Sequence, residues 1–340
     1  MRFIKAFFIF AIAACIFHCS VALLLIDAPL PAEYWVAEMI AIKKYLVQQH
    51  TGSKKIIIAG GSSTLFGIDT EYASRQLNIP VINFGLHAGL RLEKILQEVE
   101  SVIENGDCLI LILEPPYYTH TSRLTTWQVS NIIGWNHDSW KAMNYKEKGK
   151  FIFSISPLQL GQMFTAKVQQ KFYPTAISDR LATFDSNLTL SKFHTRVTSA
   201  DFQYSAYNLN SHGDLLRTEG SNFKGMGYDL SQPNHVTPEI ERYLCDFANS
   251  IKKKGATVYF ANTPYIASEK HLMTPEKDES NFLSDLSNIG QMIDKREDLV
   301  FQRKYFFNTP LHLNAEGRAL RTNLLIKAIR TNILTDATGL

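Results

Sequence analysis

The chain has 340 residues, of which 45% are apolar and 20% are charged, and its formal net charge is +3. This composition is typical of a globular protein and excludes a largely disordered chain. The small net charge gives no basic patch of the kind that binds nucleic acid. Neither a zinc-finger motif nor a glycine-rich phosphate-binding motif occurs in the sequence.

The four cysteines, Cys15, Cys19, Cys108 and Cys245, contain no C-x-x-C pair and do not cluster with histidines. Such spacing is typical neither of a disulfide framework nor of a structural zinc site. We therefore expect no metal and no cofactor.

An apolar segment from Phe7 to Ile26 follows Arg2 and Lys5 and is long enough to cross a bilayer as a helix. Positive charge before such a segment favours a cytoplasmic N-terminus, with the rest of the chain outside. We predict a signal anchor over residues 1–28. A lipoprotein signal cleaved before Cys15 is disfavoured because the sequence stays apolar beyond it, and a buried core helix because the segment is apolar all round.

Residues 29–53 are predicted to form a juxtamembrane helix and linker. Beyond them, buried strands alternate with amphipathic helices, and two of the strands contain the continuous apolar runs Ile56-Ile57-Ile58 and Leu109 to Leu113. Strands are predicted at 55–59, 80–84 and 108–113, and helices at 71–77 and 91–104. Continuous apolar strands separated by helices are typical of a parallel sheet covered on both faces.

The alternation stops between Thr119 and His235 and then resumes. The predicted elements that follow are a helix at 237–253, a strand at 256–261, a helix at 282–295, a strand at 299–307 and a terminal helix from Asn314. We predict one α/β domain over residues 54–335, with a large insertion or cap at 119–236.

The turn Gly60-Gly61-Ser62-Ser63-Thr64 follows the first of these strands directly. A turn at this place presents a side chain at the carboxyl edge of the sheet, where open α/β folds bind ligands. Ser63 is therefore a candidate nucleophile, with ordinary turn chemistry as the alternative. His312, in a loop before the terminal helix, is the candidate general base.

The early Gly-Ser-Ser turn and the late His-Leu-Asn-x-x-Gly loop that begins at His312 resemble the first and last signature blocks of the SGNH (GDSL-type) hydrolase superfamily. The resemblance covers residues 54–118 and 237–330. It implies a three-layer α/β/α, flavodoxin-like fold in which Ser63 is the nucleophile and His312 the base, without a cofactor.

Two further positions follow from the resemblance. The family's oxyanion glycine falls near the end of the second strand, where Gly85 and Gly89 are both candidates, beside the amide of the serine. The family's asparagine after the third strand is replaced by Glu114-Pro115-Pro116-Tyr117-Tyr118. We assign Glu114 and Tyr117, together with His87, to substrate binding.

The family's aspartate, three residues before the histidine, is Thr309 here, and the place one residue earlier, which some membrane-anchored relatives use, holds Asn308. Neither is a carboxylate. In a serine-protease triad the change from Asp to Asn lowers turnover by roughly 10⁴-fold, whereas papain-like enzymes use an asparagine to orient the histidine. We take Asn308 as the third candidate catalytic residue.

The anchor and the two motifs together are most similar to bacterial SGNH-like proteins that partner membrane-bound O-acyltransferases (MBOAT). The resemblance implies an envelope O-acyltransferase or esterase at the bacterial cytoplasmic membrane, with its C-terminal domain on the extracytoplasmic or periplasmic side. Its partners would be an MBOAT acyl donor and a polysaccharide or cell-wall polymer acceptor. Two alternatives stay open: a catalytically inactive scaffold or polysaccharide-binding domain, and a plain α/β domain with accidental motif matches.

The insertion carries aromatic and basic side chains of less specific meaning. Its tryptophans fit sugar stacking, a membrane interface or, more commonly, packing inside a cap, and its lysines fit anionic polymers, lipid headgroups or a solvated face. These residues are Trp127, Trp135, Trp140, Lys141, Lys146, Lys148 and Lys150. The polar loop 207–214 is predicted as a structural turn, with cleft lining as the alternative.

Overall fold

A computed structural model of the chain describes residues 2–30, 32–119, 124–173, 185–195, 204–221, 223–224, 235–266 and 276–334. The chain divides into two compact units. The first, Met1–Ala37 with Ser122–Ser186, is called the anchor unit, and the second, Glu38–Thr121 with Asn187–Leu340, is called the sheet unit. Helix α2 (Tyr34–Gln48) begins in the anchor unit and ends in the sheet unit.

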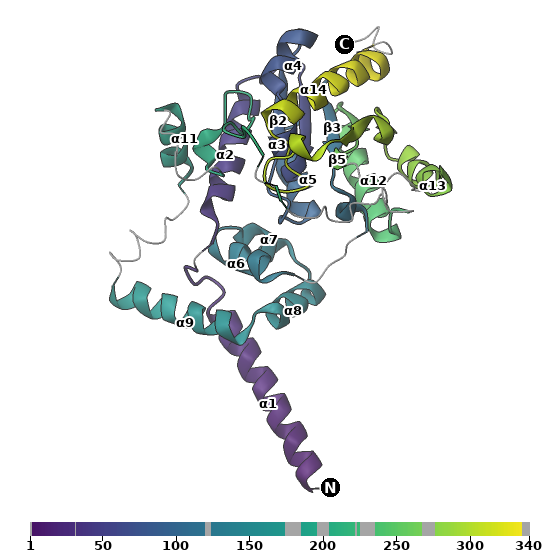
Figure 1. Ribbon diagram of the computed structural model, residues 1–340. Coiled ribbons are helices and arrows are strands. Elements are labelled where there is room, and N and C mark those ends of the chain that lie inside the picture. Colours follow the sequence, from purple (N-terminus) through teal and green to yellow (C-terminus); the bar gives the residue numbers. More distant parts are fainter. Residues whose placement is uncertain are drawn as a thin grey trace. The chain divides into compact units, whose positions relative to one another are not determined.

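The sheet unit is built on five parallel strands in the order β2-β1-β3-β4-β6. The strands are β1 (Ile56–Gly60), β2 (Val81–Gly85), β3 (Cys108–Ile112), β4 (Thr257–Phe260) and β6 (Gln291–Met292) (Figure 1). Every residue of β1, β2 and β3 is buried. Burial on both faces explains the continuous apolar runs of β1 and β3, whereas β2 carries the polar Asn83, whose side chain is hydrogen-bonded inside the protein.

The other regular elements of this unit are short strands and helices. A separate parallel pair joins β5 (Tyr265–Ile266) to β7 (Val300–Phe301). The helices are α3 (Ser62–Gly67), α4 (Thr70–Leu77), α5 (Leu92–Glu100), α11 (Ser186–His194), α12 (Pro238–Lys253), α13 (Glu276–Ser287) and α14 (Ala315–Ile329).

Helices cover both faces of the sheet. On one face, Ile56 and Ile58 of β1 pack in one buried cluster with Leu325 and Ile329 of α14, and α4 contributes to the same cluster. Helices α5 and α12 contact β1 and β4 but contribute nothing to that cluster. Because successive strand side chains point to opposite faces, α5 and α12 cover the other face.

The predicted α/β class, central parallel sheet and apolar N-terminal helix are confirmed. Two predicted elements late in the chain were wrong. The predicted helix at 282–295 ends at Ser287 and is followed by β6, and the predicted strand at 299–307 is a two-residue strand followed by a 3-10 turn. Strands of two residues are too short to show a period of their own.

The anchor unit is helical. Its first helix, α1 (Arg2–Leu24), is long and apolar enough to cross a membrane. The others are α6 (Thr126–Gly134), α7 (His137–Ala142), α8 (Tyr145–Ser154) and α9 (Pro157–Phe172). Helices α6, α8 and α9 each begin with a capping box, in which the N-cap side chain and the side chain three residues on bond each other's backbone N–H groups.

Close approaches between backbone segments require glycine at the ends of β1 and β2. A Cβ atom on Gly85 would overlap the backbone nitrogen of Leu65, and one on Gly60 would overlap the carbonyl oxygen of Ile112. Because the obstacles are backbone atoms, no side-chain movement relieves the overlap. Gly85 therefore sets how closely α3 lies to the end of β2, and Gly60 sets how closely β1 lies to the end of β3.

We expect Gly85→Ala to lower the free energy of unfolding by about 1–3 kcal/mol, because α3 must shift to admit the methyl group. Chemical unfolding of the full chain in detergent micelles measures this. The matched control is Gly67→Ala in α3, where the added Cβ would meet only the Leu313 side chain at 4.0 Å. Equal destabilisation by the two substitutions would contradict the close-approach argument.

Candidate functional site

Ser63 is the second residue of α3, which follows β1 at the carboxyl edge of the sheet. The residue is only 2% exposed. Its backbone N–H donates a hydrogen bond of 2.9 Å to Oε1 of Glu114, which follows β3 at the same edge. The Ser63 hydroxyl is buried and has no hydrogen bond of ordinary geometry within the described residues. It still lies near enough to the Glu114 carboxyl to lower the pKa of that group.

Glu114 is a buried carboxyl placed against the turn. Burial raises its pKa, and hydrogen bonds from the Ser63 and Gly61 backbone oppose that rise only in part. The same carboxyl explains why residue 61 is glycine, since a Cβ there would lie 2.5 Å from the Glu114 Oε2 atom. The Ser63 amide, expected to face a substrate oxygen, is thus engaged by Glu114 in this structure.

His312 is held by a neutral partner. Its Nδ1 atom lies 2.8 Å from Oδ1 of Asn308, and its ring stacks on Phe66 with centroids 4.0 Å apart. An amide oxygen only accepts hydrogen bonds, so the proton is assigned to Nδ1 and Nε2 keeps a lone pair. Burial, aided by the charge of His87 nearby, lowers the pKa of His312 to about 3.

Helix α3 links the serine to the histidine. Phe66 lies one helical turn beyond Ser63 and therefore on the same side of the helix. The ring that stacks on His312 is thus carried by the helix that holds the candidate nucleophile near its start. Two bonded pairs, Ser63 with Glu114 and His312 with Asn308, form a cluster around α3 and are joined through Phe66. Within the described residues, no hydrogen bond joins the Ser63 hydroxyl to His312.

Tyr204 belongs to this cluster, although no sequence signal indicated it. Its hydroxyl accepts a hydrogen bond of 2.7 Å from Nδ2 of Asn308, and its ring lies 5.5 Å from the ring of Phe66. The bond to Nδ2 fixes the Asn308 amide so that Oδ1 faces His312. Tyr204 therefore positions the partner of the histidine.

The remaining predicted residues line the same edge with their polar groups engaged. The Gly85 N–H donates to Asn83 Oδ1 at 2.8 Å, and the Gly89 N–H donates to His87 Nδ1 at 3.0 Å. The Tyr117 hydroxyl lies 3.0 Å from the carbonyl oxygen of Ala88. The candidate oxyanion donors at residues 85 and 89 thus have acceptors within the protein.

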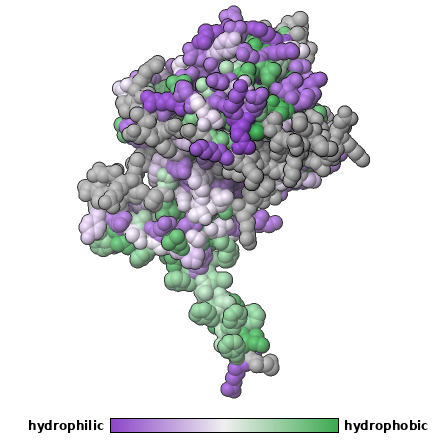
Figure 2. Space-filling model, viewed as in Figure 1, coloured by the Kyte–Doolittle hydropathy of each residue, from purple (hydrophilic) through white to green (hydrophobic). Residues whose placement is uncertain are grey.

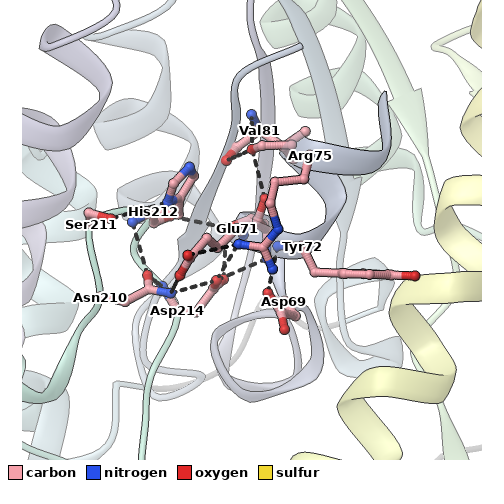
Figure 3. Close-up of polar contacts among 11 residues, drawn as sticks. Asp69, Glu71, Tyr72, Arg75, Val81, Asn210, Ser211, His212 and Asp214 are labelled. Atoms are coloured by element: carbon pink, nitrogen blue, oxygen red, sulfur yellow. Dashed lines mark hydrogen bonds and ion pairs between the residues drawn. The ribbon is translucent and has the colours of Figure 1, made fainter. Parts of the chain in front are cut away.

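The polar loop 207–214 acts as a structural support. Asp214 accepts hydrogen bonds from the backbone and hydroxyl of Thr70 at the start of α4, at 2.9 and 2.8 Å, and from Asn83 Nδ2 at 3.1 Å. Figure 3 shows Asp214 and Asn210 pointing toward the first turn of α4. The loop therefore fastens α4 to the end of β2.

Lys43 of α2 completes this support from inside the protein. It is fully buried, and its ammonium donates to the carbonyl oxygens of Asn83 and Gly213 at 2.8 and 2.9 Å. Burial lowers the pKa of Lys43 to about 7, and the charge of Asp214 opposes that shift. The network holds β2, which carries Gly85, against the loop.

Two tryptophans of the insertion are engaged within the anchor unit. Trp135 donates a hydrogen bond of 2.6 Å from Nε1 to Asn131, and the Trp140 ring packs 5.2 Å from the ring of Phe151. These contacts agree with packing inside a cap. Among the described residues, no three His, Cys, Asp or Glu side chains gather as a metal site.

No family model, curated protein or solved structure matches the chain.

The buried Glu114 predicts a pH-dependent stability difference. The pKa of Glu114 in the folded protein is raised above the ordinary value of 4.5. As the pH rises above 4.5, the carboxyl loses its proton more readily in the unfolded chain, so the wild type loses stability. Glu114→Gln cannot ionise, and each pKa unit of separation contributes about 1.4 kcal/mol. We expect the free energy of unfolding of the variant, relative to wild type, to rise as the pH increases above 4.5.

Glu104→Gln is the control of opposite sign. The hydrogen bond from Lys55 lowers the pKa of Glu104, so its contribution to stability is present at neutral pH and is lost on acidification. Relative stability of this variant should fall as pH rises. Parallel curves for Glu114→Gln and wild type would contradict the burial argument.

Proposed function

We propose that the sheet unit is an SGNH-type serine acyltransferase or esterase, with Ser63 as the nucleophile and His312 as general base and acid. One observation carries the proposal. Asn308 holds Nδ1 of His312, so that Nε2 keeps its lone pair, and the imidazole stacks on Phe66, which lies one turn beyond Ser63 on α3. An oriented neutral histidine is the general base that activates a serine hydroxyl.

The sheet supports this assignment. The order β2-β1-β3-β4-β6 is the flavodoxin-like order 2-1-3-4-5, in which ligands bind at the carboxyl ends of the strands. Ser63 follows β1 and Glu114 follows β3 at that edge. Helices on both faces of the sheet agree with the three-layer α/β/α architecture of the SGNH superfamily.

The reaction proceeds in two transfers. His312 Nε2 takes the proton of the Ser63 hydroxyl while Oγ attacks the acyl carbonyl, and the collapsing tetrahedral intermediate releases the donor's alcohol or thiol with that proton. The acceptor hydroxyl then gives its proton to His312 as it attacks the acyl-serine ester. Collapse returns the proton to Ser63 and releases the acylated acceptor. When the acceptor is water, the same cycle is ester hydrolysis.

Glu114 has a defined place in this cycle. A carboxyl oxygen at the Ser63 N–H occupies the position where such a site binds the oxyanion. The oxyanion of the tetrahedral intermediate replaces that oxygen at the Ser63 N–H. A raised pKa favours the neutral form of Glu114, which limits repulsion between the carboxyl and the developing negative charge.

The location of the chain follows from its first helix. We place α1 across the bacterial cytoplasmic membrane, with Arg2 and Lys5 on the cytoplasmic side and the sheet unit outside. The resemblance to SGNH-like proteins that partner membrane-bound O-acyltransferases then implies an extracytoplasmic polysaccharide or cell-wall polymer as the acceptor and an MBOAT-type membrane acyltransferase as the acyl donor.

The second candidate function is a catalytically inactive domain that binds polysaccharide or acts as a scaffold in an O-acyltransferase complex. Two observations favour it. Asn308 gives no negative charge to stabilise a protonated His312, and Glu114 occupies the Ser63 N–H. The experiments below separate the two functions.

Labelling of the full chain in lipid vesicles with a fluorophosphonate probe tests the nucleophile. We expect wild type to be labelled, Ser63→Ala not to be labelled, and His312→Gln to be labelled at least about 100-fold more slowly. Ser62→Ala is the matched control in the same turn and should keep the wild-type rate. No labelling of folded wild type would support the scaffold, and labelling of Ser63→Ala would refute the assignment of the nucleophile.

Asn308→Asp tests the role of the histidine partner. A carboxylate at this place stabilises the imidazolium and raises the pKa of His312, so we expect labelling about 10-fold faster or more. The Tyr204 hydroxyl, which accepts from Asn308 in the wild type, can donate to the new carboxylate. Asn308→Ala removes the bond to Nδ1 and should slow labelling. Equal rates in the three proteins would show that Asn308 does not position His312.

A further inference from the structure

Helix α9 has an apolar stripe that is exposed in the described structure. Leu158, Phe164, Val168 and Phe172 are 73%, 61%, 37% and 64% exposed. Their spacing, with Gly161 and Thr165 between them, places them along one side of the helix. We call these four residues the α9 stripe.

The α9 stripe is not the side that packs the helix into its unit. That side carries Gln159, Met163 and Ala166, which are all buried. Helix α9 is therefore apolar on a second side that folding of the unit does not use. Burying one such Leu or Phe side chain is favourable by about 1.5–3 kcal/mol of free energy. Association of the exposed stripe with an apolar surface is therefore favourable.

The apolar environment closest to the α9 stripe is the bilayer interior around α1. Contacts join α8 to α1 and join α9 to the segment that directly follows α1. The Nε2 atom of His18 in α1 lies 3.0 Å from the carbonyl oxygen of Ile152, and the His18 ring stacks on the ring of Phe153 in α8. Phe153 is itself 64% exposed. Lys167 of α9 forms a 2.8 Å ion pair with Asp27, three residues beyond α1.

The arrangement within the anchor unit agrees with these contacts. Figure 1 shows α9 running crosswise to α1 at the end of α1 that is far from the N-terminus. In Figure 2, hydrophobic residues cover α1 and continue onto the adjoining part of the unit. His18 lies six residues before the end of α1, a rise of about 9 Å, so Phe153 lies alongside the last turns of the apolar helix.

Charge favours a lipid surface over a protein groove. Between residues 124 and 173 there are six lysines and only two acidic residues, Asp138 and Glu147. Two of these lysines, Lys167 and Lys171, lie on α9. An amphipathic helix with lysines beside a Leu and Phe face is typical of helices that lie in the headgroup layer and bind anionic lipids.

We propose that the α9 stripe, with Phe153 of α8, lies in the headgroup layer of the membrane that α1 crosses. The anchor unit is then an interfacial platform as well as a single-pass anchor. This inference rests on the membrane placement of α1 in the proposed function, and it is independent of catalysis by Ser63. Its occupant is a bilayer surface that contains anionic phospholipid.

The test uses the full chain in vesicles of phosphatidylcholine with about 30% phosphatidylglycerol. Cys15, Cys19 and Cys245 are first replaced by Ala, which leaves only the buried Cys108. Single cysteines are then introduced for an environment-sensitive fluorophore, as Phe164→Cys and Val168→Cys in the stripe, Gln170→Cys on α9 and Ile12→Cys in α1. Gln170 is exposed and lies on the opposite side of α9 from the stripe.

We expect the labels at residues 164 and 168 to be quenched by lipids brominated near the headgroup. Their quenching by aqueous iodide should be at least about fivefold weaker than that of the label at residue 170. The label at residue 12 should be quenched by bromines deep in the acyl chains and be shielded from iodide.

Each other outcome has a distinct meaning. Iodide access at residues 164 and 168 equal to that at residue 170, with residue 12 shielded, overturns the interfacial helix and leaves the anchor intact. Shielding from iodide without quenching by brominated lipid shows that protein covers the stripe and also overturns the inference. Iodide access at residue 12 refutes the membrane placement of α1 and the inference with it.

Discussion

The close approach of α3 to the end of β2 is the constraint on which the candidate site depends. Gly60 and Gly85 allow backbone to lie against backbone, and Gly61 leaves room for the carboxyl of Glu114. Because α3 cannot move outward without losing these contacts, both of its ends are fixed at once. Ser63 is held at the start of the helix and Phe66, which supports His312, one turn later.

Desolvation, more than ion pairing, sets the protonation states around Ser63. Burial is the largest cause of the raised pKa of Glu114 and of the lowered pKa of His312. The partners of the histidine, Asn308 and Tyr204, are neutral. The closed cluster therefore favours uncharged groups, and protonating His312 during a reaction requires help from the negative charge that develops on the substrate or from water that enters the site.

Sequence patterns predicted β1, β2 and β3 to within a residue or two, and burial on both faces explains the continuous apolar runs of β1 and β3. The insertion was harder to predict, although the capping boxes at Thr125, Asn144 and Ser156 were readable helix starts. The bond from Ser63 to Glu114 and the support from Tyr204 join distant parts of the chain. No local pattern encodes such contacts, since only the tertiary fold brings these residues together.

The order in which the core is completed follows from α14. Leu325 and Ile329, near the end of the described chain, bury one face of β1, which was synthesised some 270 residues earlier. Until α14 arrives, α4 covers that face only in part and the sheet cannot close its core. His312, the candidate base, is also synthesised only shortly before α14. A chain interrupted before His312 during synthesis or export therefore carries the candidate nucleophile without the candidate base.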